Sequence, residues 1–115
     1  MKKDLENVII CRKGEKIKTT TLEGIQIDLF VKTDVLELMR TTMEPGASFG
    51  PPYKHVGQEA HLILKGEIEV QVDEQTYSLK EGDTIWFSSL LPHTMKNLGK
   101  EKLIFCSVVS PPTFI

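Results

Sequence analysis

The amino-acid sequence predicts a single all-β domain, a sandwich or barrel built from short strands. The chain has 115 residues, the length of one ordinary domain, and its 40% hydrophobic and 26% charged residues are a globular composition. Short segments rich in β-branched and aromatic residues alternate with turn signals about every 8 to 12 residues, which is typical of sandwiches and barrels. Pro45-Gly46, Lys65-Gly66 and Gly82-Asp83 are three of these turn signals.

Four segments have the composition of β-strands: residues 25–31, 67–72, 84–87 and 103–109. Residues 67–72 alternate polar and apolar side chains without a break, which indicates a strand with one face in water. Residues 25–31 carry an apolar row at alternate positions, with Phe30 on the other face. This row suits either the core or a subunit interface, and it consists of Ile25, Ile27, Leu29 and Val31.

Residues 33–40 contain good helix formers after a capping-like Thr33, but we expect a strand. The segment runs on without a stop signal to Met43, just before the turn at Pro45-Gly46. The first 20 or so residues have the weakest pattern and suit an edge strand or an exchanged arm. We therefore divide the chain into N-terminal strands or an arm, residues 1–35, and a barrel, residues 36–115, within one domain.

Charge and hydropathy exclude two classes of protein. Fourteen Lys and Arg against sixteen Asp and Glu give a net charge of −2, so we expect no nucleic-acid partner. No apolar run approaches the ~20 residues that span a bilayer, so we expect no membrane association. The apolar stretch 8–11 is too short for a signal peptide, and the widely spaced Cys11 and Cys106 suit reduced, buried thiols. These features predict a cytoplasmic protein.

Several other side chains have simple structural interpretations. Arg40 is expected at the surface, although an inward Arg40 would suit a substrate carboxylate. The single tryptophan and three methionines are expected in the core, the methionines alternatively lining a pocket; they are Trp86, Met39, Met43 and Met95.

The three histidines, His55, His61 and His93, have a pattern of their own. If Glu59 begins a strand, Glu59 and His61 share one face with Ile63. The opposite face of that strand is then apolar, with Ala60, Leu62 and Leu64. A buried carboxylate is costly unless it is paired or binds a metal, whereas a solvent-facing Glu59 and His61 would need no explanation.

The position of His93 in the sequence favours a metal site over a solvent-facing arrangement of Glu59 and His61. His93 is expected to begin a strand that Asn97 closes, after a loop able to return it beside His55 and Glu59. Two imidazoles and one carboxylate form a mixed nitrogen and oxygen ligand set that leaves coordination positions open, as in catalytic zinc sites and non-heme iron oxygenases.

These spacings resemble the cupin superfamily, whose motifs are G-x5-H-x-H-x3,4-E-x6-G and G-x5-P-x-G-x2-H-x3-N. Glu59-x6-Gly66 matches the end of the first motif, and His55 stands at its second histidine. Gly82, His93 and Asn97 match the second motif at the full spacing. The resemblance implies a double-stranded β-helix, or jelly-roll, barrel. It also implies that His55, Glu59 and His93 hold one divalent metal ion: Fe, Mn, Zn, Ni or Co.

The sequence departs from the family pattern at four positions: Ala47, Tyr53, Ser88 and Leu90. The change at Tyr53 removes the first motif histidine. Tyr53 is then a candidate catalytic residue that could bind the metal as a phenolate, line the pocket or act as an acid. His61, two residues beyond Glu59, is a second candidate, as a substitute ligand or a proton shuttle. A barrel without metal is the alternative.

A closer resemblance is to the cupin sensor domains of some bacterial helix-turn-helix repressors, carried by residues 44–48, 54–59 and 108–114. Residues 1–33 show no helix-turn-helix pattern, so we expect a stand-alone cupin. We expect this cupin to form a homodimer, whichever of the functions below it has. The resemblance implies that the barrel binds a small organic molecule. Three hypotheses follow: a metal-dependent enzyme of dioxygenase, isomerase or lyase type, a non-catalytic ligand-binding sensor without a DNA-binding domain, or a structural barrel that holds only water.

Overall fold

The computed structural model describes residues 7–113, and their regular structure is entirely β. Residues 1–6 of the expected N-terminal arm and residues 114–115 of the tail lie outside the described residues. The strands of the described residues are β1 (Lys18–Leu22), β2 (Ile25–Lys32), β3 (Glu37–Met43), β4 (Gln58–Lys65), β5 (Glu67–Val72), β6 (Gln75–Lys80), β7 (Thr84–Ser88), β8 (His93–Lys96) and β9 (Leu103–Ser110).

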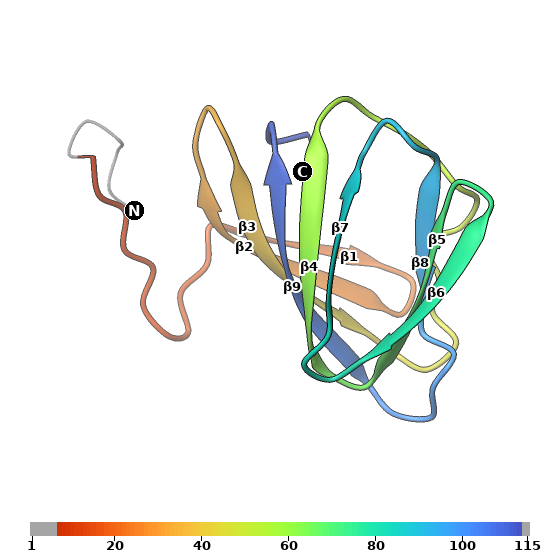
Figure 1. The fold of residues 1–115 in the computed structure, drawn as a ribbon. Helices are drawn as coiled ribbons and strands as arrows, with labels where there is room; N and C mark the ends of the chain where they lie inside the picture. The colour runs from red at the N-terminus through yellow and green to blue at the C-terminus, as the bar shows by residue number, and fades with distance from the viewer. Residues whose placement is uncertain (1–6, 114–115) are drawn as a thin grey trace.

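The strands form two antiparallel sheets that face each other (Figure 1). The larger sheet has six strands in the order β1-β2-β3-β9-β4-β7, and the smaller has three in the order β6-β5-β8. Consecutive strands β4 and β5 lie in different sheets, so the chain crosses the barrel there. The predicted all-β jelly-roll barrel is confirmed.

The core lies between the two sheets, where the inward side chains of the alternating strands form one apolar cluster. Ile25, Ile27 and Leu29 of β2 are buried, which assigns these three members of the row to the core rather than to an interface. Val31, the fourth member, lies beyond a bulge in β2 and is only partly buried. The three methionines that the sequence places in the core are buried there; they are Met39, Met43 and Met95.

The segment with both helix and strand character is a strand, as expected, but it begins only at Glu37. The residues before it form a turn. The Thr33 hydroxyl accepts hydrogen bonds from the backbone N–H of Val35 and of Leu36, at 3.1 and 3.2 Å. A threonine that bonds its own downstream backbone favours a turn over either regular structure.

The prediction that Trp86 lies in the core is wrong, because its side chain is 61% exposed. Alternation along β7 turns Phe87 inward and Trp86 outward. The indole N–H donates to Gln58 Oε1 at 2.9 Å on the outer face of the six-stranded sheet. A tryptophan is hydrophobic enough to favour burial, but the two-residue period of β7 places Trp86 on the outer face.

Two motif residues fix loops rather than chemistry. Gly66, between β4 and β5, has φ +86°, and a Cβ there would lie 2.7 Å from Lys102 O. Asn97 is fully buried and donates to Met43 O and Glu101 O, while its side-chain oxygen accepts from Gly99 N–H. Both residues close the end of the barrel opposite the histidines.

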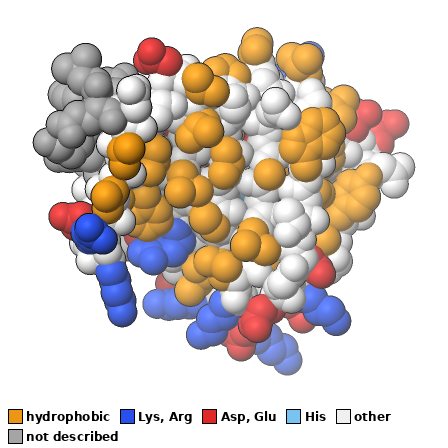
Figure 2. All heavy atoms as spheres, turned by 60° about the vertical axis from the view of Figure 1, so that its left-hand side comes forward, with side chains coloured by type: hydrophobic (Ala, Val, Ile, Leu, Met, Phe, Trp, Pro, Cys, Tyr) orange, Lys and Arg blue, Asp and Glu red, His pale blue; other side chains and the backbone are white. Residues whose placement is uncertain are grey.

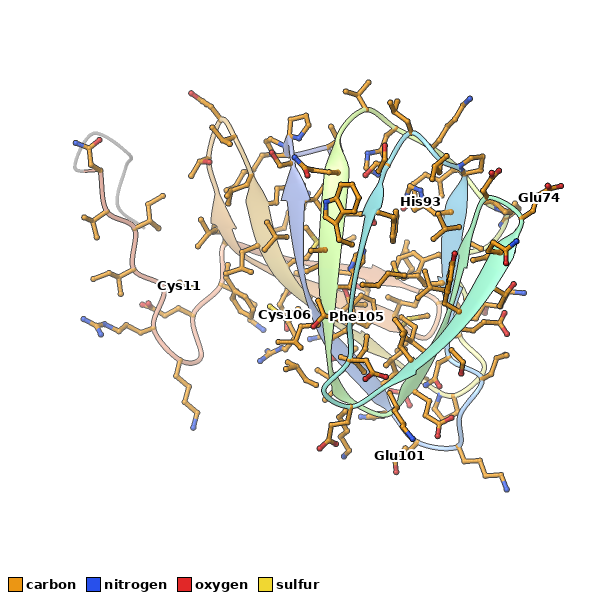
Figure 3. All side chains as sticks on the ribbon, in the orientation of Figure 1. Cys11, Glu74, His93, Glu101, Phe105 and Cys106 are labelled. Carbon is orange, nitrogen blue, oxygen red and sulfur yellow. The ribbon has the colours of Figure 1, made fainter. Side chains whose placement is uncertain are left out.

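Residues 7–17 precede β1, contain no strand and extend sideways from the barrel in Figure 1. Figure 3 shows Cys11 on this segment, well away from Cys106 on β9, and both cysteines are free and partly exposed. Arg40 is exposed, as expected, and contacts the carboxylate of Asp28. No helix within residues 7–113 is long and apolar enough to cross a membrane.

Candidate metal site

Alternation along β4 turns a carboxylate and an imidazole into the barrel. Glu59 and His61 are each 3% exposed, and Ile63 is buried beside them. Leu62 and Leu64 are exposed on the outer face. The predicted division of the two faces is confirmed, and the solvent-facing alternative for Glu59 and His61 is wrong.

The loop that carries His55 is fastened to the loop before β8 by backbone hydrogen bonds. Tyr53 N–H donates to His93 O at 3.1 Å, and His93 N–H donates to Tyr53 O at 2.9 Å. His55 N–H donates to Ser89 O, and Ser89 N–H donates to Gly57 O, both at 2.9 Å. These bonds hold His55 against the start of β8 without any side chain.

One carboxylate oxygen is the centre of the cluster. Glu59 Oε2 lies 3.1 Å from His55 Nε2 and 3.2 Å from His93 Nε2. One ligand atom from each of the three residues lies within 4.8 Å of the others. His93 lies toward the end of the barrel that carries the β5–β6 turn with Glu74, opposite the end with Glu101 (Figure 3). The three residues that the sequence nominates as metal ligands therefore come together.

The other ring nitrogens of both histidines face oxygen atoms. His93 Nδ1 lies 2.8 Å from Leu91 O, and His55 Nδ1 lies 3.2 Å from Val56 O and 3.1 Å from Thr113 Oγ1. A carbonyl only accepts, so Nδ1 carries the proton in His93, and its neutral ring presents a lone pair at Nε2. That buried Nε2 has no hydrogen-bond partner.

Ser89 completes the environment of Glu59. Its buried hydroxyl donates to Glu59 Oε2 at 2.7 Å. Burial raises the pKa of the Glu59 carboxyl, but the hydrogen bond from His61, the nearby ring of His93 and the Ser89 hydroxyl outweigh it and hold that pKa far below its usual range. The site therefore contains a permanent negative charge that is largely removed from water.

The pKa of His93 is shifted upward. Burial lowers it, but the Glu59 carboxylate and the Leu91 carbonyl together raise it above its usual value. A cation, whether a proton or a metal ion, is thus favoured at His93 Nε2.

The two candidate catalytic residues lie on opposite sides of the cluster. His61 is deeper in the barrel, with Nε2 2.8 Å from Glu59 Oε1 and Nδ1 2.6 Å from Ser107 Oγ. Tyr53 lies toward the mouth and is 40% exposed, with its ring centroid 4.9 Å from that of His93. Burial, followed by the charge of Glu59, raises the pKa of the Tyr53 phenol above its usual value.

Sequence reasoning missed three hydroxyl residues of the site: Ser89, Ser107 and Thr113. Ser107 had a usable signal, because it interrupts the inward apolar row of β9. Ser89 lies in an irregular loop and Thr113 in the C-terminal tail, where no periodicity indicates direction.

Comparisons with known proteins agree with this architecture. Residues 39–109 match the Cupin domain family. An uncharacterized protein of Archaeoglobus fulgidus is 36% identical over 63 residues, which are 55% of this chain and 59% of that protein. The HTH-type transcriptional regulator PuuR of Escherichia coli is 30% identical over 79 residues, which are 69% of this chain and 43% of the regulator. The chain thus spans only about half the length of these curated relatives.

Among solved structures, an RmlC-like cupin from Shewanella frigidimarina superposes with a TM-score of 0.77 at 19% identity. The superposition covers 90% of this chain and 92% of that one, so the two share their fold over nearly their whole lengths. The sequence motifs, the two-sheet barrel and the family match over more than half of the chain agree. The chain belongs to the cupin family.

Proposed function

We propose that the protein is a metal-binding cupin in which His55, Glu59 and His93 hold one divalent ion, and that a small organic molecule binds beside it at the mouth of the barrel. The metal belongs to the group of Fe, Mn, Zn, Ni and Co, because imidazole and carboxylate ligands suit all of them. The proposal has two forms: an enzyme, in which the bound molecule reacts, and a sensor, in which it is bound without reaction.

The observation that carries the proposal is the arrangement around Glu59 Oε2. His55 Nε2 and His93 Nε2 both face this one oxygen at 3.1 and 3.2 Å. Each ring also directs its Nδ1 to a backbone carbonyl, the usual outer partner of a metal-binding histidine. One shared proton satisfies a single nitrogen–oxygen pair, whereas one divalent ion satisfies all three atoms.

The residues around the cluster suit chemistry at an open coordination position. A divalent ion there would polarise a carbonyl, activate water or bind dioxygen. The Tyr53 ring lies beside that of His93, and we propose that its hydroxyl donates a proton or a hydrogen bond to a molecule at that position. The Ser89 hydroxyl keeps the carboxylate of Glu59 oriented from the loop side.

Metal analysis of the purified protein tests the proposal. The parent should contain close to one equivalent of metal per chain after reconstitution with each of the five ions in turn. The variant His55→Ala/Glu59→Ala/His93→Ala should contain none, and His55→Ala alone should bind more weakly than the parent. A parent that takes up no metal under any of these conditions would contradict the proposal.

Ligand binding without catalysis is the second form of the proposal. The match to PuuR over 69% of this chain favours it, because that relative is a transcriptional regulator. The two forms differ in a measurable way. A sensor binds a small molecule saturably and returns it unchanged, whereas an enzyme turns it over and loses that turnover when Glu59 is replaced by alanine.

A homodimer in the cytoplasm is the setting that we propose. Figure 2 shows apolar side chains gathered on one face of the molecule. On the outer face of the six-stranded sheet, the strand register aligns one apolar row across four strands, consisting of Trp86, Ala60, Val108 and Leu38. An exposed apolar face of this kind supports pairing with a second copy. The free thiols of Cys11 and Cys106 support a reducing compartment.

A further inference from the structure

His61 lies directly behind Glu59, on the side away from the mouth of the barrel. Its Nε2 is 2.8 Å from Glu59 Oε1, and its Nδ1 is 2.6 Å from Ser107 Oγ. His61 and Ser107 face each other across β4 and β9 in register, and both are almost fully buried. The imidazole is packed between the rings of Phe87 and Phe105, each with its centroid 5.7 Å away.

The direction of these hydrogen bonds follows from their partners. The Glu59 carboxylate only accepts, so His61 Nε2–H donates to Oε1. Nδ1 is hydrogen-bonded to the Ser107 hydroxyl at the other side of the ring. His61 therefore presents an N–H at Nε2 to Glu59, whereas the ring proton of His93 is on Nδ1 and points to a carbonyl. Both ring nitrogens of His61 are engaged, so neither presents a lone pair to the cluster.

This arrangement divides the two oxygens of Glu59 between two tasks. Oε1 is committed to His61, and Oε2 faces His55, His93 and Ser89. A carboxylate held in this way presents a single oxygen to the cluster, in a fixed orientation. The polar pair of His61 and Ser107 lies among the aromatic rings of the core, and burying such a pair is costly unless each atom is partnered.

We propose that His61, supported by Ser107, is a positioning residue that holds Glu59 as a one-oxygen ligand. The inference rests on the proposed metal site and assigns His61 a place behind the ligands rather than among them. Outer partners of this kind change metal affinity about 10–100-fold when they are removed.

The test measures metal affinity directly, without any enzymatic assay. Co²⁺ is titrated into the apoprotein and followed by its visible absorption, and Zn²⁺ affinity is measured by competition with a chromophoric chelator. His61→Leu should bind both ions about 10–100-fold more weakly than the parent, with an altered Co²⁺ spectrum. His61→Gln should recover part of the affinity, because its amide N–H can donate to Glu59 Oε1.

Two matched controls separate positioning from packing. Ile63→Val lies on the same face of β4 and removes core volume without touching Glu59, so it should lower the melting temperature and leave metal affinity unchanged. Ser107→Ala should weaken metal binding several-fold, whereas Ser78→Ala, at an exposed position of β6, should not. The serine variants keep the test decisive if His61→Leu does not fold.

The outcomes distinguish the two proposals. If the parent binds metal and both His61→Leu and Ser107→Ala bind it with the parent's affinity, the positioning role is overturned and the metal site stands. If the parent binds no metal at all, the proposed metal site is overturned, and the role of His61 is overturned with it.

Discussion

Tyr53 and His93 are paired through two backbone hydrogen bonds, and their rings lie 4.9 Å apart. Tyr53 occupies the position of the first histidine in the cupin motif that the sequence resembles. The backbone pairing therefore keeps this side chain beside the cluster although its chemistry has changed from an imidazole to a phenol. Position 53 is therefore suited to a metal-binding side chain, and the tyrosine that occupies it is suited to contact a small molecule bound at the mouth of the barrel.

Replacing Tyr53 by histidine should add a fourth ligand to the proposed metal site. We expect Tyr53→His to bind Zn²⁺ at least about tenfold more tightly than the parent, since tenfold corresponds to only 1.4 kcal/mol. Tyr53→Phe keeps the ring and removes the hydroxyl, and it should bind metal with the parent's affinity. Chelator competition measures both. A large loss of affinity in Tyr53→Phe would instead identify the phenol oxygen as a ligand.

Gly57 should be intolerant of any side chain. Its φ is +118°, and a Cβ would collide with the carbonyl oxygen of Ser110 and lie 2.7 Å from Pro111 Cδ. Gly57→Ala must therefore move the tail or the loop that carries His55. We expect a loss of about 1–3 kcal/mol in unfolding free energy and weaker metal binding, measured by thermal unfolding and metal titration.

Gly14→Ala is the matched control for this substitution. Gly14 also has a positive φ, +88°, but a Cβ there meets no atom within 4 Å. The Gly14→Ala variant should have the cost of the positive φ without any steric clash, and its metal affinity should equal that of the parent. Equal metal binding by Gly57→Ala and the parent would mean that the contact between loop and tail does not position His55.

The sequence predicted most of the site because strand periodicity fixes direction. Once residues 59–65 are a strand with a buried face, Glu59 and His61 must share that face, as they do. The same period, applied to residues 84–87, would have turned Trp86 outward. The hydrophobic character of an aromatic residue favours burial but does not indicate which face of a strand its side chain occupies.

The contacts that complete the site could not be predicted in this way. The Ser89 hydroxyl reaches Glu59 from an irregular loop, and Thr113 reaches His55 from the chain after β9. Both depend on how loops from distant parts of the sequence are fastened together. Neither the hydrophobic period of a strand nor the spacing of a motif indicates which loops contact each other.

Asp28 should make the free energy of unfolding depend on pH in the acidic range. It is 2% exposed and is surrounded by Thr19, Arg40, Gln26 and Lys16. Burial raises the pKa of its carboxyl, but the hydrogen bonds from Thr19, Arg40 and Gln26 and the charge of Lys16 outweigh this and lower the pKa below its usual value. A lowered carboxyl pKa stabilises the fold fully above the unfolded pKa near 4, and this stabilisation is lost as pH falls through the folded value.

Asp28→Asn should therefore be less stable than the parent at pH 7, by about 1–2 kcal/mol. The difference should shrink as the pH falls below about 4, because the parent then loses the charged form as well. Urea unfolding at a series of pH values measures this. Asp34→Asn, at an exposed carboxyl, is the control and should follow the parent. A difference between Asp28→Asn and the parent that stays constant from pH 7 to pH 2 would contradict this account.

The apolar outer face of the six-stranded sheet should control the oligomeric state. Leu62 is 42% exposed on this face, on β4 between β9 and the edge strand β7, and a stable interface buries about 800 Å² per partner. The parent should be a dimer by light scattering, and Leu62→Lys should be a monomer because it places a charge in the contact. Thr76→Lys adds a charge on the outer side of the three-stranded sheet, on the face opposite the buried Val70, and should remain dimeric. Dissociation by Thr76→Lys with Leu62→Lys still dimeric would transfer the interface to the smaller sheet.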